Sequence, residues 1–291
     1  MMYRVRHVTT YTYTDPVLLA HHQAHLVPRS FDWQTCHRTL LRVTPTPSGI
    51  DDRGRDYYGN PIAYFALQDP HSSLVVQVVS KVEVMEHSPP EPADTPPWEE
   101  LVDLPERQQG AALLEIADYC FDSTLVRVSD EVADYARPSF PPGRPVLACL
   151  LELMHRIHRD FTYDAEATTI STPLTQVLAE RRGVCQDFAH LAIACIRAMG
   201  LPARYVSGYL LTRPPPGRKK LRGSDASHAW PSAYVPGSGW IDFDPTNDCL
   251  VGTDHVTLGW GRDYDDVCPL SGVVLGGGEQ VLDVGVDVEP V

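Results

Sequence analysis

An apolar helical repeat that starts directly after the segment GVCQD (residues 183–187) constrains this chain more than any other feature. From Phe188 to Met199 apolar side chains recur at helical spacing, and Gly200 ends the repeat. The helix therefore begins near Val184, and Cys185 falls in the first turn of a buried helix. Backbone N–H groups there lack intrahelical partners, and the partial positive charge of a helix N-terminus favours a thiolate.

Two strand-like runs follow downstream and carry the other groups that an activated thiol needs. Residues 227–235 and 240–244 are separated by a Pro-Gly turn, which predicts an antiparallel hairpin. The hairpin brings His228, early in the first run, close to Asp244, at the end of the second. A histidine can take the proton of a thiol, and a carboxylate can hold that histidine in the right tautomer. Asp242 competes with Asp244 for the carboxylate role.

Residues 173–247 resemble the transglutaminase-like core, a papain-related superfamily with a Cys, His, Asp triad. The matching segments are GVCQDFAHLAIACIRAMGLPARYVSGYL and SHAWPSAYVPGSGWIDFDPTN. The start, YRVRHVTTYTYTDPV, resembles the N-terminal β domain of bacterial members, and the tail, WGRDYDDVCPLSGVVLGGGEQ, matches the same subfamily. The resemblance implies that Cys185 is the nucleophile, His228 the general base and Asp244, which directly precedes Pro-Thr, the orienting carboxylate. It also implies that no calcium is needed.

The expected fold class is α+β. A papain-like core, in which the helix bearing Cys185 packs on an antiparallel β-sheet or barrel, follows an N-terminal antiparallel β domain. Residues 1–86 form the β domain, residues 87–105 a linker with six prolines, and residues 106–291 the catalytic core with C-terminal strands. The expected strands are 39–44, 62–67, 74–84, 203–211 and, at a sheet edge, 281–288. The expected helices are 106–119, 129–136, 145–159 and 173–180.

Composition favours a soluble, cytoplasmic enzyme. The net charge of −14 argues against nucleic acid or an anionic membrane as the main partner. No apolar run approaches the ~18 residues of a spanning helix, and the polar, strand-like N-terminus lacks the apolar stretch of a signal peptide. Seven cysteines at scattered positions include no C-x-x-C pair, which argues against a disulfide framework or a zinc site and suits a reducing compartment.

Four residues near the triad are candidates to line a substrate cleft. Gln186 and Asp187 adjoin the nucleophile, and Gln186 can donate to an oxyanion or simply serve the helix start. Tyr163 matches an aromatic that the family places upstream of the nucleophile. Trp230 is expected to wall the site beside His228. Core packing is the alternative for both aromatic residues.

Two further clusters were considered. The run HHQAH (residues 21–25) has the outline of a metal motif, but it lacks the glutamate of a zincin and lies in the β domain, so no metal site is predicted. Five cations lie between two strands of the core and form either a solvated loop or a patch that attracts an acidic acyl donor. These cations are Arg213, Arg218, Lys219, Lys220 and Arg222.

The predicted activity is thiol-dependent acyl transfer on peptide or amide bonds through a thioester, without a cofactor. If water attacks the thioester, the protein is a cysteine peptidase or amidase. This is the preferred prediction, because nothing in the chain specifies an amine acceptor site. Attack of an amine makes a protein-glutamine transglutaminase. A non-catalytic binding module with a vestigial triad is the third reading. The expected partner is a peptide or protein substrate, with glutamine- or glutamate-containing substrates as candidates, and the sequence does not indicate an oligomeric state.

Overall fold

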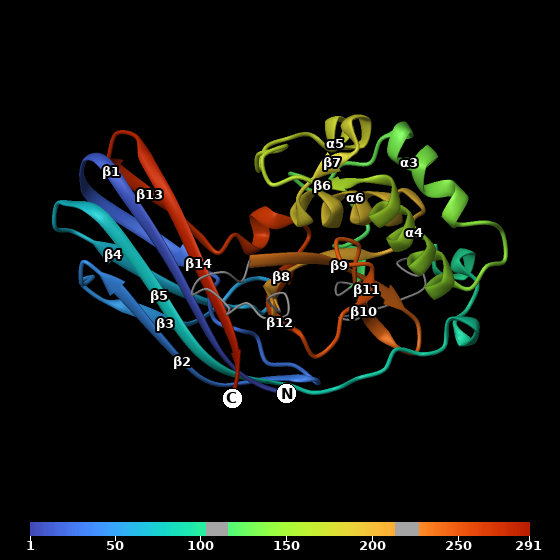
Figure 1. Cartoon of the computed structure of the whole chain (residues 1–291), viewed down its shortest axis with the longest axis horizontal. Coiled ribbons are helices and arrows are strands. Elements are labelled where there is room, and N and C mark those ends of the chain that lie inside the picture. The colour runs from blue at the N-terminus through green and yellow to red at the C-terminus, as the bar shows by residue number, and fades with distance from the viewer. Residues whose placement is uncertain (103–115, 213–226) are drawn as a thin grey trace, which may run out of the picture.

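The computed structural model describes residues 1–102, 116–212 and 227–291. The chain forms two units that lie side by side (Figure 1). One is a sheet of long strands, and the other is a smaller sheet covered by helices. The expected α+β class is confirmed.

The first unit is built around one very long strand. Its strands are β1 (Met2–Ala24), β2 (Gln34–Thr44), β3 (Ile50–Arg55), β4 (Pro61–Leu67), β5 (His71–Val84), β13 (Leu270–Gly276) and β14 (Gln280–Pro290). The first half of β1 pairs with β5 and β14, and its second half pairs with β4 and β13. Alternate residues of the first half, such as Tyr3, Val5 and His7, are buried, as the period of two predicts.

The two C-terminal strands depart from the expected domain boundaries. The sequence analysis assigned them to the catalytic core, whereas β13 and β14 return to the first unit and pair antiparallel with β1. The pairing of β14 runs from Tyr3 opposite Pro290 to Tyr13 opposite Gln280. In the described part of the chain β1 is its one partner strand, so β14 lies at the sheet edge, as expected. The first unit thus contains both ends of the described chain.

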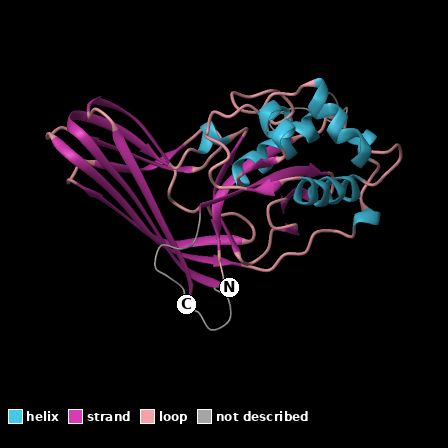
Figure 2. Ribbon diagram, turned by 45° about the horizontal axis from the view of Figure 1, so that its top comes forward, coloured by secondary structure: helices cyan, strands magenta, loops and turns pink. Residues whose placement is uncertain are grey.

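The second unit carries the helices and a five-stranded sheet. Its strands, in the order β11-β10-β9-β8-β12, are β11 (Cys249–Leu250), β10 (Gly239–Asp244), β9 (Ser227–Val235), β8 (Ala203–Leu210) and β12 (His255–Gly261). Its helices are α3 (Asp130–Ala136), α4 (Val146–Asp160), α5 (Leu174–Glu180) and α6 (Cys185–Ala198). These helices lie together beside the sheet (Figure 2). Short 3-10 turns, η1 (Pro92–Asp94) and η2 (Trp98–Leu101), lie in the proline-rich linker.

Most expected elements are confirmed within a residue or two. The predicted hairpin exists, since β9 and β10 pair antiparallel around the Pro-Gly turn. Strand β3 was not predicted, because its polar sequence IDDRGR has no alternating apolar face. The helix expected over residues 106–119 lies mostly outside the described residues. Among the described residues, no helix combines the length and apolarity needed to cross a membrane.

Helix α6 is buried on nearly every side. From Asp187 to Arg197 every residue has little or no exposed surface, because helices pack on one side of α6 and strands β8 and β9 on the other. Its small residues, such as Ala189 and Ala194, allow these elements to approach closely. A helix that is apolar all round belongs in a protein core. The helix that begins at Cys185 is therefore held rigidly against the sheet.

The two units are joined by an apolar cluster to which both contribute side chains and by two side-chain amides. Val5 and Val286 of the first unit pack with Tyr209 and Val256 of the second. Gln34 donates its amide to the Thr257 carbonyl at 2.7 Å and accepts from the Thr257 N–H at 2.8 Å. Asn60 does the same for Trp260 at 2.8 and 3.0 Å. These two amides satisfy the free edge of β12, where unpaired backbone groups are costly.

A substitution of Gly208 tests how tightly the core sheet is packed. A Cβ on Gly208 would lie 2.4 Å from the Trp230 ring and 2.4 Å from the Val256 carbonyl oxygen. We expect Gly208→Ala to lower the free energy of unfolding by about 1–3 kcal/mol in urea denaturation. The control is Gly252→Ala, since a Cβ there meets nothing within 4 Å. Equal stability of the two variants would contradict this packing.

Candidate active site

Cys185 is the first residue of α6, as predicted. Helix α5 ends at Arg181, which takes the left-handed conformation (φ 55°), and the chain then enters α6 through Val184. Asp187 holds this entry, because its Oδ2 accepts from the Val184 N–H at 2.8 Å and from the Thr168 hydroxyl at 2.6 Å. Such capping fixes the direction of the first turn. The backbone N–H of Cys185 lies in that turn, where helix geometry supplies no acceptor.

His228 and Asp244 form the hydrogen-bonded pair that the hairpin predicts. The imidazole Nε2 lies 2.6 Å from the Asp244 Oδ2, and both residues are buried. Their strands pair antiparallel, with Asp242 opposite Ser232. The Cys185 thiol lines the same cavity as this imidazole, and it raises the pKa of the imidazole. Since Nε2 faces Asp244, Nδ1 is the ring nitrogen left to face the cavity.

Asp244 is surrounded by donors. Its Oδ1 accepts from the backbone N–H groups of Thr246 and Asn247 at 2.9 and 3.2 Å, an arrangement typical of an aspartate that starts a turn. Its Oδ2 accepts from the Asn247 amide at 2.6 Å and from His255 Nε2 at 3.3 Å, in addition to His228. The carboxylate is fully buried. Burial by itself would raise the pKa of Asp244, but the hydrogen bonds from His228, His255 and Asn247 and the charge of His228 hold it well below its usual range.

The pKa of His228 is shifted in the opposite direction, above its ordinary value. Burial lowers the pKa of His228, but hydrogen bonds to Asp244 and Cys185 and the charges of those groups outweigh it and raise the pKa to about 10. The site therefore favours an imidazolium beside the thiol, which is the arrangement that activates cysteine nucleophiles. The protonated form contributes stability that is present below the ordinary pKa of ~6.5 and is lost as the pH rises through about 10.

Cys185 and His228 line one cavity of about 480 Å³. Gln186, Tyr205 and Tyr264 line it from the second unit. The opposite wall belongs to the first unit, where β1 and β14 contribute His7, Thr9, Tyr11, Leu282, Val284 and Val286. The cleft is thus shared between the two units, and β14 places aliphatic side chains opposite the thiol.

The four predicted cleft residues occupy different places. Gln186 lines the cavity, beside Cys185. Asp187 does not line it but is buried under the helix start, where it caps α6. Trp230 is fully buried behind His228, with ring centroids 5.9 Å apart, and serves as packing. Tyr163 is 55% exposed and pairs its backbone with Gly183 at the side of the cleft, outside the cavity lining.

Asp242, the competing carboxylate, does not contact His228 through any hydrogen bond of the described chain. Its Oδ2 accepts from the Trp230 indole N–H at 3.1 Å. Asp242 and Asp244 lie two residues apart on β10, and they take different partners on β9, Trp230 for Asp242 and His228 for Asp244. Geometry therefore agrees with Asp244 as the partner of the imidazole.

Sequence reasoning missed Asn247 and His255. Asn247 belongs to the motif DPTN, and a polar residue three positions after a turn aspartate was a usable signal. His255 begins β12 and reaches Asp244 only because β12 pairs with β8. No local pattern around His255 reveals that pairing. The aliphatic wall of β14 was missed for the same reason.

Among the described residues, one trio of side chains has ligand atoms close enough together for a metal ion: His228, Asp244 and His255. All three are buried and hydrogen-bonded to one another through Asp244. The HHQAH segment has another arrangement, because His21 is exposed, His22 is buried and His25 approaches Asp56 at 3.3 Å.

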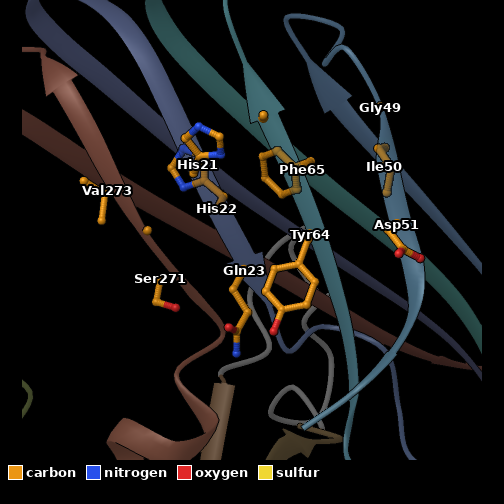
Figure 3. Close-up of a pocket in the computed structure, with 12 residues that line it drawn as sticks. His21, His22, Gln23, Gly49, Ile50, Asp51, Tyr64, Phe65, Ser271 and Val273 are labelled. Atoms are coloured by element: carbon orange, nitrogen blue, oxygen red, sulfur yellow. The ribbon is translucent and has the colours of Figure 1, made fainter.

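Another hollow of the described surface lies away from the thiol. It measures about 700 Å³ and is lined by β1, β3, β4 and β13, including His21, His22, Tyr64 and Phe65 (Figure 3). Neither Cys185 nor His228 belongs to it. The five clustered cations Arg213, Arg218, Lys219, Lys220 and Arg222 lie outside the described residues, so their place relative to the cleft stays a prediction.

Comparison with known proteins agrees with this architecture. Residues 3–83 match the bacterial transglutaminase-like N-terminal region, and residues 141–245 match the transglutaminase-like superfamily. An uncharacterized protein of Mycobacterium tuberculosis is 43% identical over 99% of this chain and 92% of its own length. A solved structure of a candidate cysteine protease from Cytophaga hutchinsonii shares the fold, with a TM-score of 0.76 at 23% identity over 99% of this chain and 90% of its own.

A shorter match is to a protein whose name states an activity. A protein-glutamine gamma-glutamyltransferase of Pseudomonas aeruginosa is 30% identical over 123 residues, which are 40% of this chain and 17% of that protein. The fold and the shared cleft define a protein of the papain-like thiol-enzyme class. Within that class, the chain belongs to the bacterial transglutaminase-like family.

Substituting each aspartate in turn tests which one serves the imidazole. We expect Asp244→Asn to lower the pKa of His228 from about 10 toward or below its ordinary ~6.5, because a hydrogen-bonded negative charge is removed. Histidine NMR titration measures this shift. The control Asp242→Asn is expected to leave the pKa of His228 nearly unchanged. An equal or larger shift in the control would contradict the assignment.

Proposed function

We propose that the protein is a cysteine peptidase or amidase that cleaves peptide or amide bonds through a thioester on Cys185. The observation that carries the proposal is the 2.6 Å hydrogen bond between His228 and Asp244, with Cys185 in the same cavity as His228 and raising the pKa of its imidazole. A thiol, an imidazole and a carboxylate gathered in this way supply the nucleophile, the base and the orienting group of an activated thiol.

In the first half of the reaction, the Cys185 sulfur attacks the carbonyl carbon of the substrate. The resulting oxyanion receives a hydrogen bond from the Cys185 backbone N–H, and Gln186 is the proposed second donor because its side chain lines the cavity. His228 then gives its proton to the leaving amine. The C–N bond breaks, the amine departs, and the acyl group remains on the sulfur as a thioester.

In the second half, water attacks the thioester carbonyl. His228, now neutral, takes a proton from the water, and Asp244 stabilises the imidazolium that forms. The C–S bond breaks, and the carboxylic acid product leaves. The sulfur is restored beside the imidazolium, so the site returns to its starting state.

The lining of the cleft supports water as the acceptor. An amine acceptor is cationic before it reacts, and no Asp or Glu is present among the described residues that line the cavity. The apolar wall of β14 opposite the thiol suits an extended peptide better than a charged amine. A peptide or protein substrate is therefore the proposed partner, with the protein-glutamine gamma-glutamyltransferase reaction as the second candidate, favoured by the relative from Pseudomonas aeruginosa.

The interpretation of the protein as a non-catalytic binding module is less favoured. Such a module would not require Cys185, His228 and Asp244 to lie together, as they do here. A cytoplasmic location stays a prediction, in keeping with seven cysteines that are all free.

The identity of the acceptor, water or an amine, is tested by measuring two products of one reaction. A mixture of protein substrates is incubated with the enzyme and an excess of a fluorescent primary amine. New N-termini are counted by mass spectrometry, and covalent amine incorporation is measured by fluorescence. We expect new N-termini to exceed incorporated amine, and both signals to vanish in Cys185→Ala.

Cys195→Ala is the matched control, because Cys195 is a buried thiol of the same helix whose pKa burial raises to about 12. Activity should persist in that variant. Predominant amine incorporation would replace hydrolysis with transamidation. Product formation that survives Cys185→Ala would contradict the thiol mechanism as a whole.

A further inference from the structure

A pocket separate from the cavity of Cys185 lies where the linker passes strands β10 and β11. It has a volume of about 370 Å³. Three segments meet there, since it is lined by Trp33, by the linker residues His87, Ser88, Pro89 and Pro90, and by Ser238, Trp240, Ile241, Asp242, Leu250 and Val251 of the β10–β11 region. None of the lining residues is shared with the cleft that holds Cys185.

Three buried polar atoms of this pocket lack a hydrogen-bond partner within the described parts of the chain. They are Asp242 Oδ1, Trp240 Nε1 and His87 Nδ1. Asp242 and Trp240 are both more than nine-tenths buried. A buried polar group without a partner costs free energy, and such groups are few in folded proteins. The carboxylate oxygen of Asp242 can only accept, so a ligand that donates a hydrogen bond would satisfy it, whereas the Trp240 indole N–H is a donor and calls for a separate acceptor.

The charge of the pocket specifies the ligand. Asp242 supplies a carboxylate, and no Lys or Arg is found among the residues that line the pocket. Burial lowers the pKa of His87 and outweighs the opposing effect of Asp242, so this imidazole is neutral at pH 7. A buried carboxylate without a cationic partner is strongly unfavourable. A cation bound beside Asp242 would compensate it.

The walls of the pocket also suit a cation. Trp33 and His87 stack with ring centroids 4.4 Å apart and an interplanar angle of 14°. Trp240 adds a second indole, although its ring already carries the Arg204 guanidinium, 4.3 Å from the centroid. Pro89, Pro90 and Leu250 add apolar surface. Aromatic faces attract organic cations, whose carbon atoms bury well against apolar walls.

We propose that this pocket binds a small organic cation, an alkyl ammonium group, with Asp242 as its anionic partner and Trp33 as its aromatic wall. The ammonium donates to Asp242 Oδ1, and its alkyl chain lies along the apolar wall. The other carboxylate oxygen keeps its bond with Trp230, whose ring lies 5.9 Å from His228 and 5.2 Å from His255. The site is therefore distinct from the thiol cleft but adjacent to its imidazole.

The test uses two forms of the same cation and one neutral probe. Binding of n-butylammonium, of the capped peptide acetyl-Gly-Lys-Gly-amide and of butan-1-ol to the full chain is measured by titration calorimetry and tryptophan fluorescence. Working in the Cys185→Ala variant keeps this test independent of any catalytic function. We expect saturable binding of at least one cation and at least about tenfold weaker binding of the alcohol. Preference for butylammonium indicates a free amine, and preference for the peptide indicates a lysine side chain.

Asp242→Asn should weaken binding of the cation at least about tenfold, while its amide oxygen can still accept from Trp230. Asp69→Asn is the control, because Asp69 is exposed in the turn between β4 and β5. Trp33→Leu provides a second variant that leaves the core sheet intact and should weaken binding by about threefold or more. Absence of saturable binding, equal binding of butan-1-ol, or affinity unchanged in both variants would overturn the proposal.

Discussion

The buried carboxylate of Asp244 is the constraint on which the rest of the site depends. A charge with no exposure to water must be compensated within the protein, and five hydrogen bonds do so here. They come from the turn that follows β10, from His228 on β9 and from His255 on β12. Three strands of the core sheet therefore have to be in register before the carboxylate can be buried. The fold and the acid–base pair are mutually dependent.

The first unit has a part in the site as well as in the fold. Gln34 and Asn60 reach across to satisfy the edge of β12, the strand that carries His255. On the same side, β1 and β14 close one wall of the thiol cleft. The β domain thus both supports the core and forms one wall of the cavity that holds Cys185.

Local sequence was sufficient for the elements whose partners are close in the chain. The helix that begins at Cys185 follows from an apolar repeat and a glycine stop, and the hairpin that joins His228 to Asp244 follows from two strands around a Pro-Gly turn. Contacts between distant segments were not predictable in this way. The return of β14 to pair with β1 is decided by packing between residues more than 250 positions apart, as in Tyr3 opposite Pro290. Asp187, expected to line the cleft, instead caps α6 through the Val184 N–H three residues before it, and its place at the third helical position was a local signal for that role.

The central claim, an assembled and activated thiol, is tested most directly by the labelling rate of Cys185 with iodoacetamide at pH 6.5, followed by peptide mass mapping. Cys36 and Cys268, which are also partly exposed, serve as internal references. The account predicts that Cys185 reacts at least about tenfold faster than both, and that His228→Ala removes this advantage. Labelling of Cys185 at the same rate as the reference cysteines, unaffected by the substitution, would contradict it.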